Sequence, residues 1–362
     1  MNRLAYRIRF HTPAFLGNAE QVGQWRTPPI KALLRQWWRV AYAAGRQGEP
    51  GLVATMRADE GQLFGAAADG GDSCRSLLRL RLDQWTEGRL KSWQGIEQPS
   101  VRHDDVEQTG FQVGPHAYLG FGPLDARGGT KLAGKRTAIA AGDFTVLRMA
   151  LDGQRNAGLA EREAPRLATA LVLMNHYGTL GGRSRNGWGS FSLAPADDAT
   201  PAIDATLDPS LVRPWRDALT LDWPHAIGRD TSGPLIWQTD ACQDWKTLMR
   251  RLAEIKIGLR TQFKFTTGKT QRPEPRHWLS YPVTNHSVSS WGNARLPNSL
   301  RFKVRPGADG KLHGVIVHLP CLPPDTETAR FRPDRATIED VWQRVHAFLD
   351  QQPATTLTRT SV

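Results

Sequence analysis

The chain has 362 residues, 40% hydrophobic and 23% charged, which excludes a disordered protein and allows two domains of ordinary size. Lysine and arginine outnumber aspartate and glutamate by 47 to 35, and the net charge of +12 favours a polyanionic partner, nucleic acid first. Three widely spaced cysteines form neither a disulfide framework nor a zinc motif, and neither a signal peptide nor a membrane span is evident. We therefore expect a cytoplasmic protein with no metal, no cofactor and no membrane partner.

The first elements along the chain are a strand and a helix. Apolar and polar residues alternate in residues 4–10, which predicts a strand. From Ile30, apolar residues recur at the spacing of one helical face, with Thr27 as a plausible N-cap, Pro28 at the first helical position and Gly45 at the end. The apolar face of this helix is expected to pack on a sheet.

The rest of the first half completes a β-α-β-β-α-β order. Residues 76–82 and 143–151 predict strands, residues 164–178 predict a helix, and a glycine-rich loop then leads into a short strand. This order is typical of a ferredoxin-like (RRM-like) domain. The irregular residues 84–142 then form a long insertion between its middle strands, and a loop of that length is usually functional or mobile.

The second half repeats this order more loosely after a linker at residues 194–215, rich in Ala, Pro and Asp. The α+β fold predicted from these patterns has two tandem ferredoxin-like domains, residues 1–200 and 215–352, and a flexible tail, 353–362. No final strand is evident in the second domain. Its other predicted elements are strands at residues 219–228, 234–239, 300–304 and 314–320 and helices at residues 245–260 and 337–351.

The opening helix has a basic stripe beside its apolar face. Lys31, Arg35 and Arg39 are spaced four apart, and no acidic residue of the helix offsets them. Such a stripe suits phosphates, and Trp38 at its edge suits stacking on a base. The alternative is that Trp37 and Trp38 are core residues and that the stripe is a solvated face.

Residues 181–190, GGRSRNGWGS, combine bare backbone with two arginines directly after a helix. Glycines let the backbone approach a ligand closely, and successive N–H groups can form an anion-binding nest. The loop is neither a Walker A loop nor a dinucleotide fingerprint. The alternative is a structural turn with solvent-exposed arginines. The candidate RNA-binding residues of the loop are Gly182, Arg183, Ser184, Arg185, Gly187 and Gly189.

A third basic segment follows the predicted helix of the second domain. Residues 250–276 hold eight lysines or arginines against two acids, with aromatic residues among them. A basic, aromatic loop of this kind is typical of a nucleic-acid contact, and Lys264, Lys269 and Arg272 are its candidate residues. A mobile, solvated loop is the alternative.

Catalytic patterns are much weaker. The ten histidines are scattered, without a metal-binding or nucleophile motif. His103 and the two following aspartates are more consistent with a solvated turn than with metal ligands. His11 and His176 can act as acid or base in RNA cleavage, although a structural role is favoured for each. We predict no catalytic residue and no metal site.

Together these segments resemble the RAMP superfamily of CRISPR proteins, whose main signature is a glycine-rich loop before the last strand of a ferredoxin-like domain. The pairing of HTPAFLGN (11–18) with PPIKALLRQWWR (28–39) is similar to the family of first Cmr subunits of type III-B effector complexes. Asn18, Lys31 and Ala32 depart from that family's usual glycine, arginine and glycine. The resemblance covers the first domain well and the second only in outline.

The resemblance implies a non-catalytic RNA-binding subunit of a type III-B ribonucleoprotein. Such a subunit contacts the 3′ region of the guide (CRISPR) RNA, helps to capture target RNA for antiviral defence and has other Cmr subunits as partners. It also implies roles for the basic helix and for the glycine-rich loop. The helix residues that it carries over are Lys31, Arg35, Trp38 and Arg39.

Two other functions stay open. One is a metal-independent endoribonuclease of the same superfamily that processes CRISPR transcripts, which needs a histidine such as His11 near the RNA. The other is an unrelated interaction module whose basic faces meet acidic protein partners.

Overall fold

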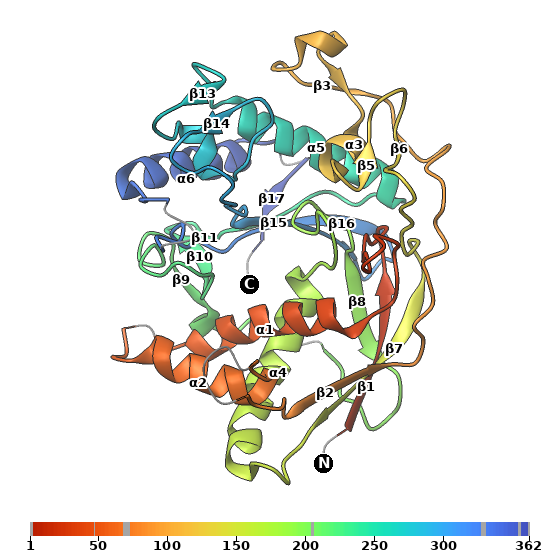
Figure 1. The fold of residues 1–362 in the computed structure, drawn as a ribbon, viewed down its shortest axis with the longest axis vertical. Helices are drawn as coiled ribbons and strands as arrows, with labels where there is room; N and C mark the ends of the chain where they lie inside the picture. Colours follow the sequence, from red (N-terminus) through yellow and green to blue (C-terminus); the bar gives the residue numbers. More distant parts are fainter. Residues whose placement is uncertain are drawn as a thin grey trace.

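A computed structural model describes residues 3–46, 48–67, 73–203, 206–326, 331–353 and 356–360 (Figure 1). These residues form a mixed α+β structure organised by two four-stranded antiparallel sheets. One sheet comes from the N-terminal half of the chain and the other from the C-terminal half. Helices pack against both.

The first sheet has the strand order β2-β7-β1-β8. Its strands are β1 (Arg3–Phe10), β2 (Leu78–Leu82), β7 (Phe144–Leu151) and β8 (Phe191–Pro195). Taken along the chain, these are the second, third, first and fourth strands, all antiparallel to their neighbours. This is the order that a β-α-β-β-α-β pattern predicts.

Two long helices, α1 (Thr27–Ala43) and α4 (Ala157–Tyr177), pack against each other on one face of this sheet. The N-cap prediction for α1 was wrong, because Arg26 is the N-cap and Thr27 is already helical. The prediction for α4 began too late. The Asn156 side chain accepts a hydrogen bond from the backbone N–H of Leu159 and so caps the helix well before residue 164.

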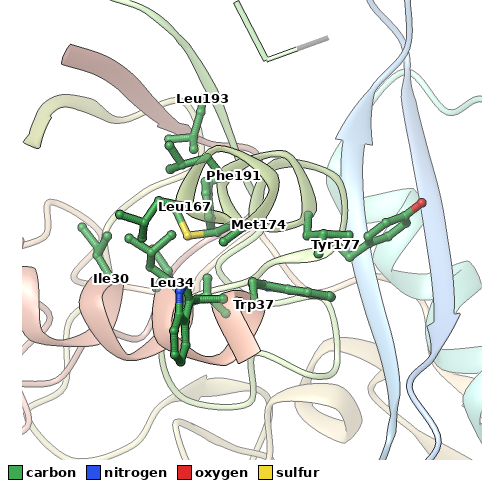
Figure 2. Packing of buried hydrophobic residues seen from close by; sticks show 14 of the residues in the cluster. Ile30, Leu34, Trp37, Leu167, Met174, Tyr177, Phe191 and Leu193 are labelled. Atoms are coloured by element: carbon green, nitrogen blue, oxygen red, sulfur yellow. The ribbon is translucent and has the colours of Figure 1, made fainter. Parts of the chain in front are cut away.

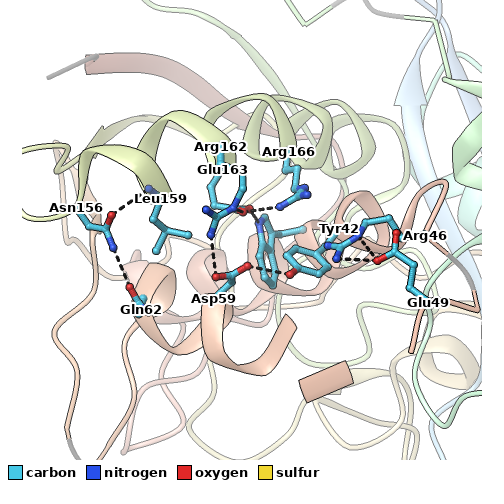
Figure 3. Close-up of polar contacts among 11 residues, drawn as sticks. Tyr42, Arg46, Glu49, Asp59, Gln62, Asn156, Leu159, Arg162, Glu163 and Arg166 are labelled. Atoms are coloured by element: carbon cyan, nitrogen blue, oxygen red, sulfur yellow. Dashed lines mark hydrogen bonds and ion pairs between the residues drawn. The ribbon is translucent and has the colours of Figure 1, made fainter. Parts of the chain in front are cut away.

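A further helix, α2 (Leu52–Phe64), packs beside α1 and α4 and was not predicted. Its buried residues include Glu60, a residue type that sequence patterns assign to the surface. Figure 3 shows polar contacts that hold the three helices together. Asp59 of α2 accepts hydrogen bonds from Tyr42 of α1, at 2.8 Å, and from Arg162 of α4, at 3.0 Å.

The core between the helices and the sheet is shown in Figure 2. Ile30, Leu34 and Trp37 of α1 face Leu167 and Met174 of α4, and each of these side chains is buried. Apolar burial of this kind contributes about 25 cal/mol per Å² and is the main force that holds the sheet and helices together. The expected packing of the apolar face of α1 is therefore confirmed.

The insertion between β2 and β7 crosses to the C-terminal half of the molecule. Its helix α3 (Pro115–Gly120) packs on α5 (Trp245–Thr261). His116 of α3 is fully buried, and its ring lies among the rings of Trp93, Trp188 and Trp245. The other elements of the insertion are β3 (Val101–Arg102), η1 (Glu107–Thr109), β4 (Gln112–Val113), β5 (Leu124–Asp125) and β6 (Lys131–Leu132).

The second sheet has the order β15-β16-β12-β17. Its strands are β12 (Ile236–Gln238), β15 (Leu300–Pro306), β16 (Leu312–His318) and β17 (Thr358–Arg359), and α6 (Arg335–Asp350) lies between β16 and β17. The expectation of no final strand was wrong, because the described part of the predicted flexible tail contains β17, whereas residues 354, 355, 361 and 362 of that tail lie outside the described residues. Arg359 of β17 pairs with Trp237 of β12 in the ladder, and its guanidinium binds the carboxylate of Asp230 at 2.6 Å.

Shorter elements flank this sheet. The predicted linker contributes β9, which pairs in parallel with β10, so that it is not merely a spacer. The predicted strand at residues 219–228 was largely wrong, because only its last two residues lie in a strand. These elements are η2 (Pro209–Leu211), β9 (Val212–Pro214), β10 (Ile227–Asp230), β11 (Gly233–Pro234), β13 (Lys269–Thr270), η3 (Pro275–Trp278) and β14 (Ser287–Val288).

Strand β15 joins the two halves through its basic side chains. Arg301, Lys303 and Arg305 alternate along the strand and so share one face. The Lys303 amine donates to the backbone carbonyls of Met174, at 3.2 Å, and Asn175, at 2.5 Å, near the C-terminal end of α4. Burial and the charge of Arg305 hold the pKa of Lys303 well below its usual value, and an amine donates both of these hydrogen bonds whether or not it is charged.

We predict that Lys303→Ala lowers the free energy of unfolding by about 3 kcal/mol, because it removes the donor to both carbonyls and leaves a cavity. Lys303→Met retains most of the volume but cannot donate, and should still lower it by more than about 1 kcal/mol. Urea denaturation followed by far-UV circular dichroism measures both changes.

Lys311→Ala, at the exposed turn between β15 and β16, is the matched control and should change stability by less than about 0.5 kcal/mol. Wild-type stability in Lys303→Met would contradict the capping role of the amine.

Candidate nucleic-acid interface

The basic stripe of α1 is partly neutralised by a carboxylate that the helix itself does not contain. Glu60 of α2 is buried, and its carboxylate accepts hydrogen bonds from both Arg35 and Arg39. Their side chains remain 43% and 33% exposed. Only Lys31 of the stripe has no ion pair with another described residue. The stripe is therefore a weaker phosphate site than its sequence predicts.

The prediction that Trp38 stacks on a base was wrong for this conformation. Its ring is fully buried, and its indole N–H donates to Glu163 of α4 at 2.8 Å. Rings of Tyr42 and Phe64 pack against it. Trp37 is also in the core, at 1% exposure. The alternative that both tryptophans anchor the helix is confirmed.

Two glycines of the loop 181–190 are needed for the fold of the loop itself, because each has a positive φ and lies against other parts of the protein. Gly189 has a φ of +65°, and an added Cβ would lie 1.8 Å from the carbonyl oxygen of Leu180. Gly187 has a φ of +92° and lies against Met249 of α5. Both glycines are buried, so their prediction as RNA contacts was wrong. Gly182 and Ser184, in contrast, are only half-buried.

The middle of the loop pairs with β15 of the other half. The backbone N–H of Phe302 donates to the Arg185 carbonyl at 3.1 Å, and the Arg185 guanidinium donates to the Asn298 carbonyl at 2.5 Å. Burial lowers the pKa of Arg185. Arg185 therefore makes these polar contacts within the protein, which differs from the solvent-exposed arginine that the alternative interpretation expected.

Arg183 is the exposed arginine of the loop and lies in a cluster of cations. Burial of its inner part and the nearby charges of Arg260 and Arg295 lower its pKa. Burial and the charges of Arg260 and Arg183 hold the pKa of Lys256 well below its usual value. Burial and Arg260 likewise lower the pKa of Arg276. We call this set the junction cluster: Arg183, Lys256, Arg260, Arg276 and Arg295.

One carboxylate borders the junction cluster. Asp105 of the insertion binds Arg276 and also binds Lys264, at 2.7 Å. These cations lower the pKa of Asp105 although its partial burial raises it. Because Asp105 binds both residues, Lys264 lies next to Arg276 of the junction cluster. No contact of this kind brings Lys269 or Arg272, both exposed, to it in the described part of the chain.

The junction cluster has donors that the protein leaves unused. The Nε atoms of Arg260 and Arg276 and the hydroxyl of Tyr118 are buried without a hydrogen-bond partner among the described residues. An unmet buried donor costs about 1–3 kcal/mol, which a bound anion would offset. Phe121, 57% exposed, lies beside Arg183, whose guanidinium donates to the Phe121 carbonyl and lies 6.0 Å from the ring centroid.

Sequence patterns missed Arg295 and Phe121 and gave no individual weight to Lys256, Arg260 and Arg276. The last three are part of the basic segment 250–276, which pointed to the correct region. No local pattern could have found Arg295 or Phe121, because each joins the cluster only through the packing of the insertion and of the loop before β15.

The described residues contain no group of three or more histidine, cysteine or acidic side chains placed to hold a metal ion. His11 hydrogen-bonds Ser192 at 2.9 Å, and burial, Lys303 and Arg9 lower its pKa to about 4. Arg305 contacts the Nδ1 atom of His176 at 2.8 Å. Among these same described residues, no helix has the length and apolar character needed to cross a membrane.

No protein-family model and no curated protein matches the chain. Among solved structures, it is similar to Cmr1 from Pyrococcus furiosus in its apo form, at 13% identity and a TM-score of 0.45, with 96% of this chain and 97% of that chain covered. It is also similar to a chain of the type III-B Cmr-beta complex bound to cognate target RNA, at 12% identity and a TM-score of 0.48, with 95% and 99% covered. A structure of that complex bound to cognate target RNA and AMPPnP, in the presence of ssDNA, gives 11% identity and a TM-score of 0.47, with 95% and 98% covered.

We predict that Gly189→Ala lowers the free energy of unfolding by about 3 kcal/mol or more, because the new methyl meets the Leu180 carbonyl at a backbone angle that side chains rarely adopt. Gly128→Ala is the control: its φ is +69° but no atom lies within 4 Å of the added Cβ. It should cost about 1 kcal/mol. Equal destabilisation of the two variants in urea denaturation would contradict a structural role for Gly189.

Proposed function

We propose that the chain is a non-catalytic RNA-binding subunit of a type III-B CRISPR (Cmr) effector complex. It contacts the guide RNA near its 3′ region, or captures target RNA, and assembles with other Cmr subunits. The observation that carries the RNA-binding part is the junction cluster, where four guanidinium groups and the Lys256 amine meet and Asp105 is the carboxylate that borders them among the described residues. The motifs of residues 11–18, 28–39 and 181–190 support the assignment to such a complex.

The cluster combines guanidinium groups, which match phosphate and carboxylate oxygens alike, with an exposed aromatic ring. Guanidinium groups from three separate segments converge: Arg183 on the loop, Arg260 on α5 and Arg295 before β15. Their planar forks match phosphate oxygens, and the exposed ring of Phe121 beside them can stack on a base. An acidic protein partner would bind the guanidinium groups but would have no base to stack on the ring. The ring therefore favours RNA binding over the alternative of an interaction module for acidic proteins.

Strand order supports the interpretation of the chain as two ferredoxin-like domains. Both four-stranded sheets have the order second, third, first, fourth along their own segment. In each half, a helix lies between the first and second strands and another between the third and fourth, with α2 as an additional helix after α1 in the first half. On this interpretation the junction cluster lies where the two domains meet, and the insertion completes it.

The endoribonuclease alternative is less well supported. His11 lies beside Ser192, and its pKa of about 4 leaves it neutral at pH 7, so that it cannot donate a proton there as a general acid. Its neighbours Lys303 and Arg9 are cations, and no carboxylate orients its ring among the described contacts.

We predict that the double variant Arg183→Glu/Arg260→Glu weakens binding of single-stranded RNA at least tenfold at low salt. Each phosphate that is no longer bound should reduce the slope of log K against log salt by about 0.7. Fluorescence anisotropy across a salt series measures both quantities. The fold should be retained, because the Arg183 side chain is exposed and Arg260 is half-buried.

Arg57→Glu on the exposed side of α2 makes the same kind of charge change far from the cluster and is the control for net charge. An equal fall in affinity in Arg57→Glu, or an unchanged slope in the double variant, would contradict binding at the junction.

We also predict that the purified protein does not cleave CRISPR repeat RNA without metal at any pH between 5 and 8. Cleavage that is abolished in His11→Ala and falls as pH drops toward 4, where His11 gains its proton, would instead establish the endoribonuclease function. Denaturing gel electrophoresis of labelled RNA provides the measurement.

A further inference from the structure

The first sheet has an open face that is basic and aromatic, opposite the face covered by α1 and α4. Side chains alternate across a strand, so that Arg7 and Arg9 of β1 point away from the core residues Ile8 and Phe10. The ladder places Arg9 directly opposite Phe144 of β7. The same alternation gives the basic and aromatic residues of this face: Arg3, Arg7 and Arg9 on β1, Arg79 and Arg81 on β2, and Phe144 and Arg148 on β7.

Phe144 is an exposed ring held between two cations. It is 47% exposed, and the guanidinium groups of Arg7 and Arg9 lie 5.5 Å and 5.4 Å from its centroid. Exposure of a large aromatic ring forfeits the free energy of its burial. The two arginines give the ring polar neighbours but leave its surface accessible.

The charges of this face are only partly neutralised. Arg148 binds Asp83, at 2.7 Å, and Arg79 binds Asp152, at 2.5 Å. Arg7, Arg9 and Arg81 form no ion pair with a described carboxylate, although Arg81 lies close enough to Asp83 to lower the pKa of that carboxyl.

Arg81 also lies directly opposite Arg148 in the β2–β7 ladder. Like charges in that position destabilise a sheet, and the carboxylate of Asp83, whose pKa both arginines lower, offsets part of the repulsion.

A hollow of about 510 Å³ opens beside the ring of Phe144. Its lining includes Trp25 and, from the segment after β2, Gln84 and Glu87. Of its other carboxylates, Asp83 and Asp143 each bind an arginine. The hollow therefore offers space next to a stacking surface, with polar groups at its rim.

We propose that this open face is a second site for single-stranded nucleic acid, in which a base stacks on Phe144 and the arginines of β1 and β2 hold the flanking phosphates. Accessible aromatic rings on a four-stranded sheet stack bases in this way, and the stacking tolerates any base sequence. The face is built from β1, β2 and β7, whereas the junction cluster comes from α5, η3 and the loops before β8 and β15. The two sites are therefore separate in the fold and can be tested separately.

The experiment measures binding of a single-stranded RNA that carries 2-aminopurine, by anisotropy and by quenching, together with a duplex of the same sequence. Phe144→Ala should weaken single-strand binding about tenfold and remove the part of the quenching that Phe144 causes, which is the part that persists in Phe121→Ala. Phe144→Trp should retain both, and neither change should alter binding of the duplex. Phe121→Ala, at the junction cluster, is the matched ring control and should leave quenching by Phe144 in place.

The arginines are tested in the same assay. Arg7→Ala/Arg9→Ala should reduce the salt slope by about 0.7 for each phosphate that is released, in addition to the effect of Arg183→Glu/Arg260→Glu. Wild-type affinity and quenching in Phe144→Ala would overturn the proposal, as would an equal weakening for single strand and duplex. Weaker binding in the junction variant alone would support the proposed function without this site, and weaker binding in Phe144→Ala alone would support this site without the junction.

Discussion

The contact between the Lys303 amine and the C-terminal carbonyls of α4 is the constraint on which the arrangement of the two halves depends. A lysine is almost never fully buried unless its charge is satisfied. Here Lys303 is 1% exposed, and its position on β15 fixes the distance between that strand and the end of α4. The glycine-rich loop leaves α4 at this point, so its path and its pairing with β15 follow from the same contact.

The basic side chains of β15 donate to neutral oxygens, and this affects the electrostatic potential around the glycine-rich loop. Lys303 binds carbonyl oxygens, and Arg301 binds the amide oxygen of Gln36 at 3.3 Å. Neutral oxygens satisfy donors but do not cancel net charge. Burial lowers the pKa of Arg301 only to about 9, so that it stays a cation at pH 7 and, beside Arg185, adds to the positive field around the loop that carries Arg183. On α1, in contrast, Glu60 supplies a full negative charge, and the local field is weaker.

The sequence predicted much of the first half because its signals were local. The alternation of residues 4–10 and the helical spacing from Ile30 each state which side of an element faces the core, and packing agreed with both. The predictions that failed depended on distant partners. The short strand β17 exists because β12 offers it an edge, and the carboxylate of Glu60 neutralises α1 only because α2 folds beside it.

In the candidate site, too, the features with a local sequence signal were predicted and those that depend on distant residues were not. The sequence predicted that the backbone at the glycines of the loop makes a close contact. Only the fold shows that the backbone of Gly189 approaches Leu180 rather than a ligand. Positive charge on a segment is visible in a sequence, whereas its freedom to bind an anion is decided by whatever packs around it. Asp105 illustrates this limit: it lies in an irregular insertion and yet binds Lys264 and Arg276, which are more than a hundred and fifty residues away. A single carboxylate shared by two cations leaves net positive charge beside Arg260, and the insertion thereby orders these side chains without neutralising them.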